Sequence, residues 1–183
     1  GIPPYPDRSE FNPGGLSVVW AEENSRDSLF AALRRREVYG TSGPRITVRF
    51  FGGYDFTPDD AQSRYLAEAG YAKGVPMGGD LKLATPGKVP TFLVAALKDP
   101  QGANLDRIQV VKGWLDRNGK LHEKVYDVAW SGDRKPDPKT GKLPEVGSTV
   151  DVANATWTNT IGAPELVAVW KDPEFDPGQP AFY

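Results

Sequence analysis

The sequence predicts a mostly β protein of the α+β class, and the larger part is expected to be an antiparallel β-sandwich-like domain. Residues 91–97 form an apolar run that is typical of a central strand. Residues 106–115 and 120–130 flank the sequence Asp-Arg-Asn-Gly, and Asn-Gly between two strands strongly favours a hairpin. Several short strands separated by turn residues are typical of an antiparallel sandwich.

Further strands are expected on both sides of these segments. A short apolar run with β-branched residues predicts a buried strand in residues 15–21. Residues 45–51 alternate between polar and apolar side chains, as a half-buried strand does. Two more strands are predicted at residues 150–157 and 166–170, after a polar loop with three prolines and three glycines at residues 131–148.

Two helices are predicted in the first half of the chain. Asn24 and Ser25 supply N-cap chemistry for a helix that continues to about Glu37. A second, short helix is expected to start at residues 57–60, where a threonine cap precedes a proline and two acids, and to end near Gly70. Helical spacing places three apolar residues on one face of the first helix: Leu29, Phe30 and Leu33.

Three consecutive arginines, at positions 34–36, occupy the last turn of the first helix. Positive side chains are favourable there because the helix dipole makes the C-terminal end negative. A solvated helix end is therefore the favoured interpretation, and contact with an anion is the alternative. Glycines and a proline in residues 40–44 then turn the chain, and we place the change of architecture at this turn.

Composition excludes several classes of function. At 183 residues the chain can form one ordinary domain, or one domain and a fragment of another. Its formal net charge of -2 argues against nucleic acid as a partner and against an anionic membrane surface. No apolar run reaches the roughly 18 residues that a membrane span needs, and the first residues do not have the pattern of a signal peptide.

The chain is poor in the side chains that most often carry catalysis. It has no cysteine and a single histidine, His122. The lack of cysteine excludes disulfides, thiolate metal ligands and a cysteine nucleophile, and a catalytic zinc site usually takes two or three imidazoles. We therefore predict no catalytic residue, no cofactor site and no metal site within this chain.

The strand-to-helix junction at Glu22, Glu23 and Asn24 is the position where α/β proteins often place functional groups. Two adjacent carboxylates could assist a metal or a proton transfer, but a metal needs more ligands than these two supply. The favoured alternative is that Asn24 caps the helix and that the glutamates interact with its positive end.

Five tryptophans raise a further alternative, a platform on which sugar rings stack. Most of them lie inside apolar strand patterns, so packing in the core is the favoured interpretation. Trp114 and Trp157 are the two that a glycan-binding surface would have to expose.

Long stretches of the sequence resemble a single protein family. They comprise residues 12–26, which continue through 33–46, then residues 107–114, 124–129 and 170–173. These stretches are similar to the domain-of-unknown-function family 3604, a group of mostly uncharacterised bacterial proteins that are often exported. The resemblance extends over nearly the whole chain.

The resemblance implies a longer parent protein. Its N-terminal part is similar to the PHP-type metallohydrolases, including the CehA/McbA-like group, whose barrel binds divalent metal ions through His, Asp and Glu. Residues 1–42 would be the last strand and helix of that barrel, and residues 43–183 a β-rich C-terminal domain whose family pattern continues beyond Tyr183. A periplasmic or secreted location follows from the same resemblance.

The family's metal ligands precede this chain, so the resemblance assigns no metal ligand to it. Five residues match the family's pattern and are candidates for a site: Glu22, Glu23, Asn24, Arg26 and Arg45.

These observations lead to three hypotheses. In the first, the chain is a structural or accessory C-terminal part of a metal-dependent hydrolase, its partner is the N-terminal barrel of the same protein, and the chain alone is not catalytic. In the second, it is a β-sandwich module that binds glycan or cell-wall polymer. In the third, an open strand edge after residue 170 allows self-association by strand addition.

Overall fold

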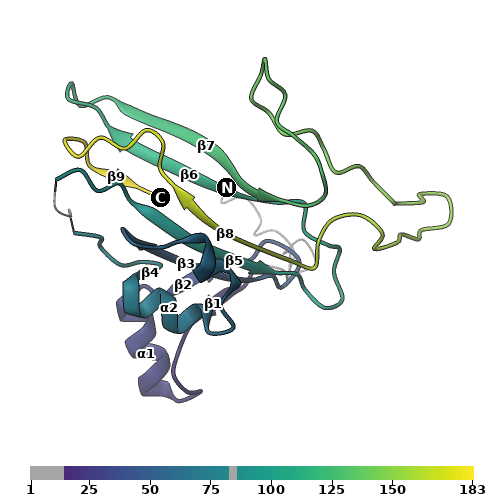
Figure 1. The fold of residues 1–183 in the computed structure, drawn as a ribbon. Coiled ribbons are helices and arrows are strands. Elements are labelled where there is room, and N and C mark those ends of the chain that lie inside the picture. Colours follow the sequence, from purple (N-terminus) through teal and green to yellow (C-terminus); the bar gives the residue numbers. More distant parts are fainter. Residues whose placement is uncertain (1–14, 83–85) are drawn as a thin grey trace, which may run out of the picture.

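The computed structural model describes residues 15–82 and 86–183, and its centre is a four-stranded antiparallel sheet (Figure 1). The strand order is β4-β3-β5-β8. The strands are β3 (Thr47–Gly53), β4 (Gly74–Pro76), β5 (Thr91–Leu97) and β8 (Glu165–Lys171). Strand β5 pairs with both β3 and β8 along its whole length, which agrees with the central strand that its apolar sequence predicts.

A three-stranded sheet in the order β7-β6-β9 forms the second layer. Strands β6 (Arg107–Leu115) and β7 (Leu121–Trp130) form the predicted hairpin around the Asn-Gly turn, where Gly119 has a φ of 77°. The short strand β9 (Ala181–Phe182) pairs with β6. Both multi-stranded sheets are antiparallel, so the predicted mostly β, α+β fold is confirmed.

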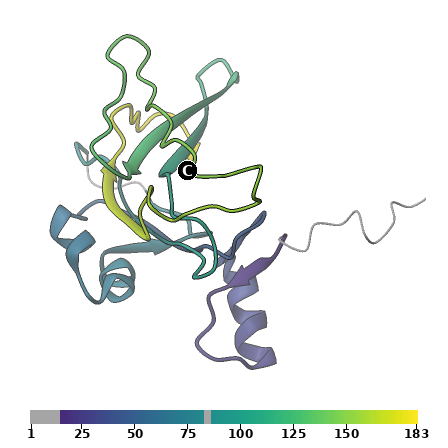
Figure 2. The ribbon, with the colours of Figure 1, turned by 90° about the vertical axis from the view of Figure 1, so that its right-hand side faces the viewer.

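A small unit precedes these sheets. Strands β1 (Ser17–Val19) and β2 (Val38–Gly40) pair with each other, and helix α1 (Arg26–Arg35) connects them. Figure 2 shows α1 and β1 extending away from the two larger sheets. Ser25 rather than Asn24 is the N-cap of α1, because its side chain accepts a hydrogen bond from the backbone N–H of Ser28.

The second predicted helix is interrupted. A 3-10 helix, η2 (Pro58–Gln62), begins at the predicted threonine cap, and a separate helix, α2 (Leu66–Lys73), follows it. The break lies at Ser63, whose extended backbone ends η2. Among the residues that the structure describes, no helix has the length and apolar character needed to cross a membrane.

The prediction of a strand at residues 150–157 was wrong. The segment makes only one isolated bridge, between Asp151 and Thr156, and its residues are exposed. The Asp151 carboxylate accepts hydrogen bonds from the backbone N–H groups of Ala153 and Asn154. This local turn chemistry competes with strand pairing and explains why the β-branched residues here do not form a strand.

Both faces of the four-stranded sheet are covered, which explains the run of buried residues in β5. On one face, Phe51 and Leu93 are fully buried and pack with Phe56 near α2 and η2. On the opposite face, Ala96 and Leu166 form a second cluster with side chains from the β6-β7 hairpin, including Ile108 and Ala129. The molecule therefore has a central sheet between a second sheet and a helical layer (Figure 1).

Aromatic rings contribute to the contact between the two sheets. Trp170 of β8 lies 4.9 Å from the Tyr126 ring of β7 and 5.6 Å from the Phe92 ring of β5, measured between centroids. Tyr183 adds a ring 4.3 Å from that of Phe92. Such tilted aromatic pairs stabilise packing by about 0.5–1.5 kcal/mol each beyond the area they bury.

An ion pair is buried beside these rings. The Nζ of Lys112, in β6, lies 2.5 Å from Oδ2 of Asp172, which follows β8, and both residues are buried. The Tyr183 hydroxyl donates a second hydrogen bond to the same oxygen at 2.6 Å. Burial alone would raise the pKa of Asp172, but the hydrogen bonds from Lys112 and Tyr183 outweigh it and hold the pKa below its usual value of 3.8.

Self-association by strand addition would require a sheet edge that is free to pair with a strand of another molecule. Strand β8 is the last strand in the order β4-β3-β5-β8, so within the described ranges no strand pairs with its outer edge. The segment after it instead returns to the second sheet as β9. Self-association through a strand edge stays a prediction.

Gly70 provides a test of the packing between α2 and the central sheet. A Cβ at this position would lie 2.5 Å from the ring of Phe51, which is fully buried and cannot move away. We expect Gly70→Ala to lower the free energy of unfolding by about 1–3 kcal/mol in urea, despite the higher helix propensity of alanine. Gly43→Ala is the control, because a Cβ there meets nothing within 4 Å. Equal stability of the two variants would contradict this packing.

The buried ion pair predicts a pH dependence of stability. Because the folded pKa of Asp172 is lowered, its stabilising effect is present above about pH 4 and is lost as the pH falls through the folded pKa. Asp172→Asn should cost about 3–5 kcal/mol at neutral pH, since it leaves Lys112 buried without its charged partner. The variant's unfolding free energy should also depend less on pH in this acidic window.

Urea unfolding at neutral and acidic pH measures both effects. Asp133→Asn, which changes an exposed carboxylate, is the matched control and should change neither quantity. A pH profile of Asp172→Asn parallel to that of the unmodified chain would refute the assigned role of Asp172.

Candidate functional site

The candidate site is a cavity of about 410 Å³ at the junction between the β1-α1-β2 unit and the central sheet. Residues from each of the adjoining elements line it: Trp20, Ala21, Glu22, Arg35, Glu37, Arg49 and Tyr71. A volume of this size lies within the range of small-molecule pockets.

The backbone pairing of β1 and β2 positions two residues of the cavity. The ladder that pairs Val19 with Val38 continues by one step, because the Trp20 N–H donates to the Glu37 carbonyl oxygen at 3.0 Å. Arg35 is the last residue of α1. The wall is completed by Arg49 from β3 and Tyr71 from α2, so segments that are distant in sequence meet here.

Glu37 is the buried charge of the cavity, with an exposed fraction of only 2%. Its Oε1 accepts a short hydrogen bond from the Tyr71 hydroxyl and lies 3.5 Å from Nη1 of Arg49. Its Oε2 lies 3.5 Å from Nη2 of Arg35. Burial raises the pKa of the Tyr71 hydroxyl, and the hydrogen bond to Glu37 raises it further. Two cations and a hydroxyl thus compensate one buried carboxylate.

Trp20 and Arg49 form a second, stacked pair. The Cζ of Arg49 lies 3.4 Å from the centroid of the Trp20 ring, a close cation–π contact. The indole N–H of Trp20 donates to the Val48 carbonyl oxygen at 3.0 Å, which fixes the ring against β3. The guanidinium of Arg49 is therefore held in one plane before any ligand arrives.

The cavity can act chemically through several fixed groups. It offers guanidinium N–H donors, the Trp20 ring and, at Glu22, an exposed carboxylate. These groups can hold and orient a polar ligand. Over residues 15–82 and 86–183, His, Cys, Asp and Glu side chains form no group of three or more that could hold a metal ion.

Of the five residues singled out from the sequence, Glu22 alone lines this cavity. Glu23 is exposed, and its backbone N–H donates to the Ser28 hydroxyl at 3.3 Å. Asn24 is exposed, and Arg26 is the exposed first residue of α1.

The fifth candidate, Arg45, lies at the turn before β3. Its side chain is exposed, and its backbone N–H donates to Oδ2 of Asp99 at 2.7 Å. This bond, together with one from the Gln101 N–H, lowers the pKa of Asp99. Arg45 is not among the residues that line the cavity.

Sequence reasoning did not identify Glu37, Arg49 or Tyr71. One signal was present: Glu37 is a single acid directly after three arginines and before the β-branched Val38. Nothing in the sequence indicates that Arg49 and Tyr71 approach it, because those contacts span 12 and 34 residues. The arginines at the end of α1 also have different roles. Arg36, the C-cap, pairs with Asp80 at 3.2 Å, whereas Arg35 lines the cavity.

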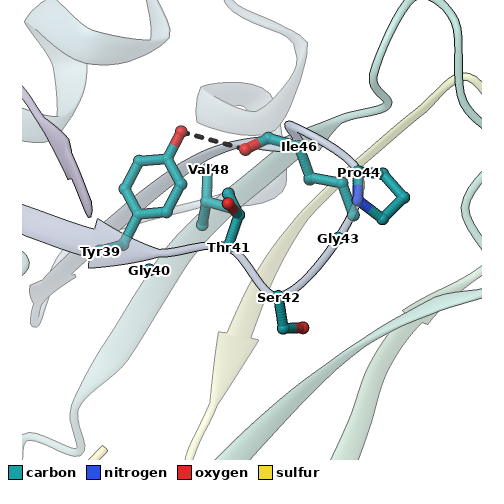
Figure 3. Close-up of a pocket in the computed structure, with 8 residues that line it drawn as sticks. All are labelled: Tyr39, Gly40, Thr41, Ser42, Gly43, Pro44, Ile46 and Val48. Carbon is teal, nitrogen blue, oxygen red and sulfur yellow. Dashed lines mark hydrogen bonds between the residues drawn. The ribbon is translucent and has the colours of Figure 1, made fainter. Parts of the chain in front are cut away.

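A second, smaller hollow of about 180 Å³ lies beside the turn that leads from β2 to β3 (Figure 3). The Tyr39 hydroxyl donates to the Ile46 carbonyl oxygen at 3.1 Å and closes the turn. The turn residues between them, Thr41 to Pro44, line the hollow, and the side chain of Ser42 points away from the Tyr39 ring. This contact fixes the geometry of the turn.

Comparison with known proteins identifies a single family. The sequence model of the family described as "Protein of unknown function (DUF3604)" matches residues 5–183. No curated protein and no solved structure matches the chain. Because the match extends over nearly all of the sequence, the chain belongs to the DUF3604 family.

Proposed function

We propose that this chain is the accessory C-terminal part of a metal-dependent hydrolase, and that the catalytic barrel lies elsewhere in the same polypeptide. The hydrolase part of the proposal rests on the resemblance to the PHP-type metallohydrolases, and the observation that supports a docked, accessory position is the uncovered apolar side of α1. Phe30 is 61% exposed and Leu33 is 50% exposed, whereas Ala32 on the same helix is fully buried. Large apolar side chains that are neighbours on an exposed helix are typical of an interface.

The barrel is the occupant that best fits this surface. The exposed pair lies on the unit of β1, α1 and β2, which extends away from the two larger sheets (Figure 2). In the proposed parent, residues 1–42 complete the barrel as its last strand and helix, and residues 43–183 form the accessory domain. Burial of Phe30 and Leu33 against neighbouring barrel elements would stabilise the assembly by roughly half of the 1.5–3 kcal/mol that full burial gives for each side chain, because each is already partly covered.

The same arrangement would place the cavity near the catalytic centre. Active sites of α/β barrels lie at the carboxyl ends of their strands. Trp20 directly follows β1 and Glu22 comes two residues later, so in the assembled protein they would lie at that end of the barrel. The accessory domain would then shape the substrate entrance through Arg49 and Tyr71, and a divalent metal bound by the barrel would supply the hydrolytic chemistry.

The first test is an activity assay of this chain alone. We expect no turnover of phosphoester or carboxylester substrates above background in the presence of divalent metal ions. Turnover that is abolished by Glu22→Gln or Glu37→Gln would overturn the proposal, because it would place a complete catalytic site in this chain.

The second test compares an α1 variant in two contexts. Phe30→Asp should leave the melting temperature of the isolated chain almost unchanged, because the side chain is already exposed. In the full-length polypeptide it should lower the melting temperature by about 5–10 °C, because a charge would be buried against the barrel. Leu121→Asp is the matched control, since Leu121 is 77% exposed on β7. Equal effects of the two variants in the full-length polypeptide would contradict the docking of α1.

A specific observation favours the alternative function, binding of glycan or cell-wall polymer. Trp157 is 47% exposed on the long loop between β7 and β8. Hydrogen bonds fix this loop: the Thr149 hydroxyl donates to the Thr158 carbonyl oxygen at 2.5 Å, and Asn104 binds the carbonyl oxygens of Asn159 and Ile161. A rigid loop with an exposed indole and neighbouring hydroxyls can stack a sugar ring.

The other proposed stacking residue, Trp114, is less suitable. It is only partly exposed, and its ring stacks on that of His122 with centroids 5.2 Å apart. His122 in turn contacts the Asp116 carboxylate at 2.9 Å. The alternative function therefore depends on Trp157.

Sedimentation with insoluble cell-wall polysaccharide tests this alternative. If Trp157 carries the interaction, Trp157→Ala should weaken it by about 1–3 kcal/mol, or roughly 5- to 150-fold. Val152→Ala, which changes an 86% exposed apolar residue of the same loop, should have little effect. Failure of the unmodified chain to sediment with the polymer would exclude the glycan-binding function.

A further inference from the structure

The junction cavity contains two guanidinium groups that are incompletely paired. Arg35 and Arg49 each approach a different oxygen of Glu37, and both N–O distances are 3.5 Å. Charge-assisted N–H···O bonds are normally about 2.7–2.9 Å long, so neither arginine is drawn into a tight pair. Within the described part of the chain, the side chain of Arg35 makes no other ion pair or hydrogen bond. Its N–H groups remain available to a ligand.

The charged side chains of the cavity lining balance formally, because Arg35 and Arg49 are matched by Glu22 and Glu37. Glu22 and Arg35 are both exposed, so water and salt screen their charges, whereas Glu37 is buried. An anion at this wall would therefore be held by directed hydrogen bonds from the two guanidinium groups and not by a net positive charge.

Stacking also prepares Arg49 to bind such a group. The indole of Trp20 covers one face of its guanidinium, so the N–H donors at the edge of that plane are held in fixed directions. Tyr71 supports the same group, because its hydroxyl accepts a hydrogen bond from Nη1 of Arg49 at 3.2 Å. A planar fork of fixed donors matches the oxygen spacing of carboxylate and phosphate groups.

We infer that this cavity is a binding site for a small molecule with an oxyanion group, a carboxylate or a phosphate, which bridges Arg35 and Arg49. The Trp20 ring bounds the same cavity and provides an apolar surface for the remainder of the ligand. The inference goes beyond the proposed accessory function, because it concerns a site formed by this chain and holds with or without a barrel.

Titration of the isotope-labelled chain with inorganic phosphate, and separately with acetate, tests the inference at constant ionic strength. The indole N–H signal of Trp20 reports on the cavity in an NMR spectrum. We expect a saturable shift of this signal with at least one of the two anions, and the anion that binds more tightly identifies the ligand class. Chloride at the same ionic strength should produce no saturable shift.

Variants of two neighbouring arginines distinguish anion binding in the cavity from nonspecific attraction of anions to the basic end of α1. Arg35→Gln should weaken the binding about tenfold, and Arg35→Lys should weaken it less because the charge is kept while the planar fork is lost. Arg34→Gln is the matched control: it removes the same charge from the adjacent position of α1, where Arg34 lies near the Phe30 ring and not in the cavity lining.

Two outcomes would overturn the inference. One is the absence of a saturable Trp20 shift with both anions. The other is equal weakening by Arg34→Gln and Arg35→Gln, which would show attraction to the basic helix end alone. Neither outcome bears on the proposed accessory function, which is tested by the activity of the chain and by Phe30→Asp in the full-length polypeptide.

Discussion

The burial of one carboxylate, that of Glu37, determines how the beginning of the described chain is attached to the rest. A buried charge without partners is too costly to persist, so its position requires donors close by. Those donors come from three different elements, namely the end of α1, strand β3 and helix α2. The ion pairs and the hydrogen bond to the Glu37 carboxylate therefore fix the β1-α1-β2 unit against the central sheet. The same requirement brings Trp20 and the arginines together around a cavity.

The opposite face of the central sheet has its own buried charge. Lys112 and Asp172 form an ion pair next to the aromatic rings of Phe92, Trp170 and Tyr183. Both polar clusters thus join segments that are distant in sequence, whereas the two apolar clusters lie around Leu93 and Ala96 on opposite faces of the central sheet. The ion pair contributes little net stability when complete, but the loss of one partner is expensive, so it favours one arrangement of the two sheets over others.

Local signals in the sequence were sufficient for much of the fold. The Asn-Gly hairpin and the apolar run of β5 were predicted correctly because turn chemistry and side-chain periodicity act over a few residues. The strand predicted at residues 150–157 was wrong because Asp151 offered the backbone a turn instead. Strands β2 and β4, each of three residues, were not predicted, since so short a pairing depends on its partner strand.

The candidate site was less predictable than the fold. Glu22 was identified from its place after a strand, but Glu37, Arg49 and Tyr71 meet only through tertiary contacts. The most direct measurement of this account is a double-mutant cycle with Glu37→Gln and Arg49→Gln, followed by urea unfolding of all four proteins. If Glu37 fixes the junction, the two sites should be coupled by about 1–3 kcal/mol. Additive effects of the two substitutions would contradict the central role of this carboxylate.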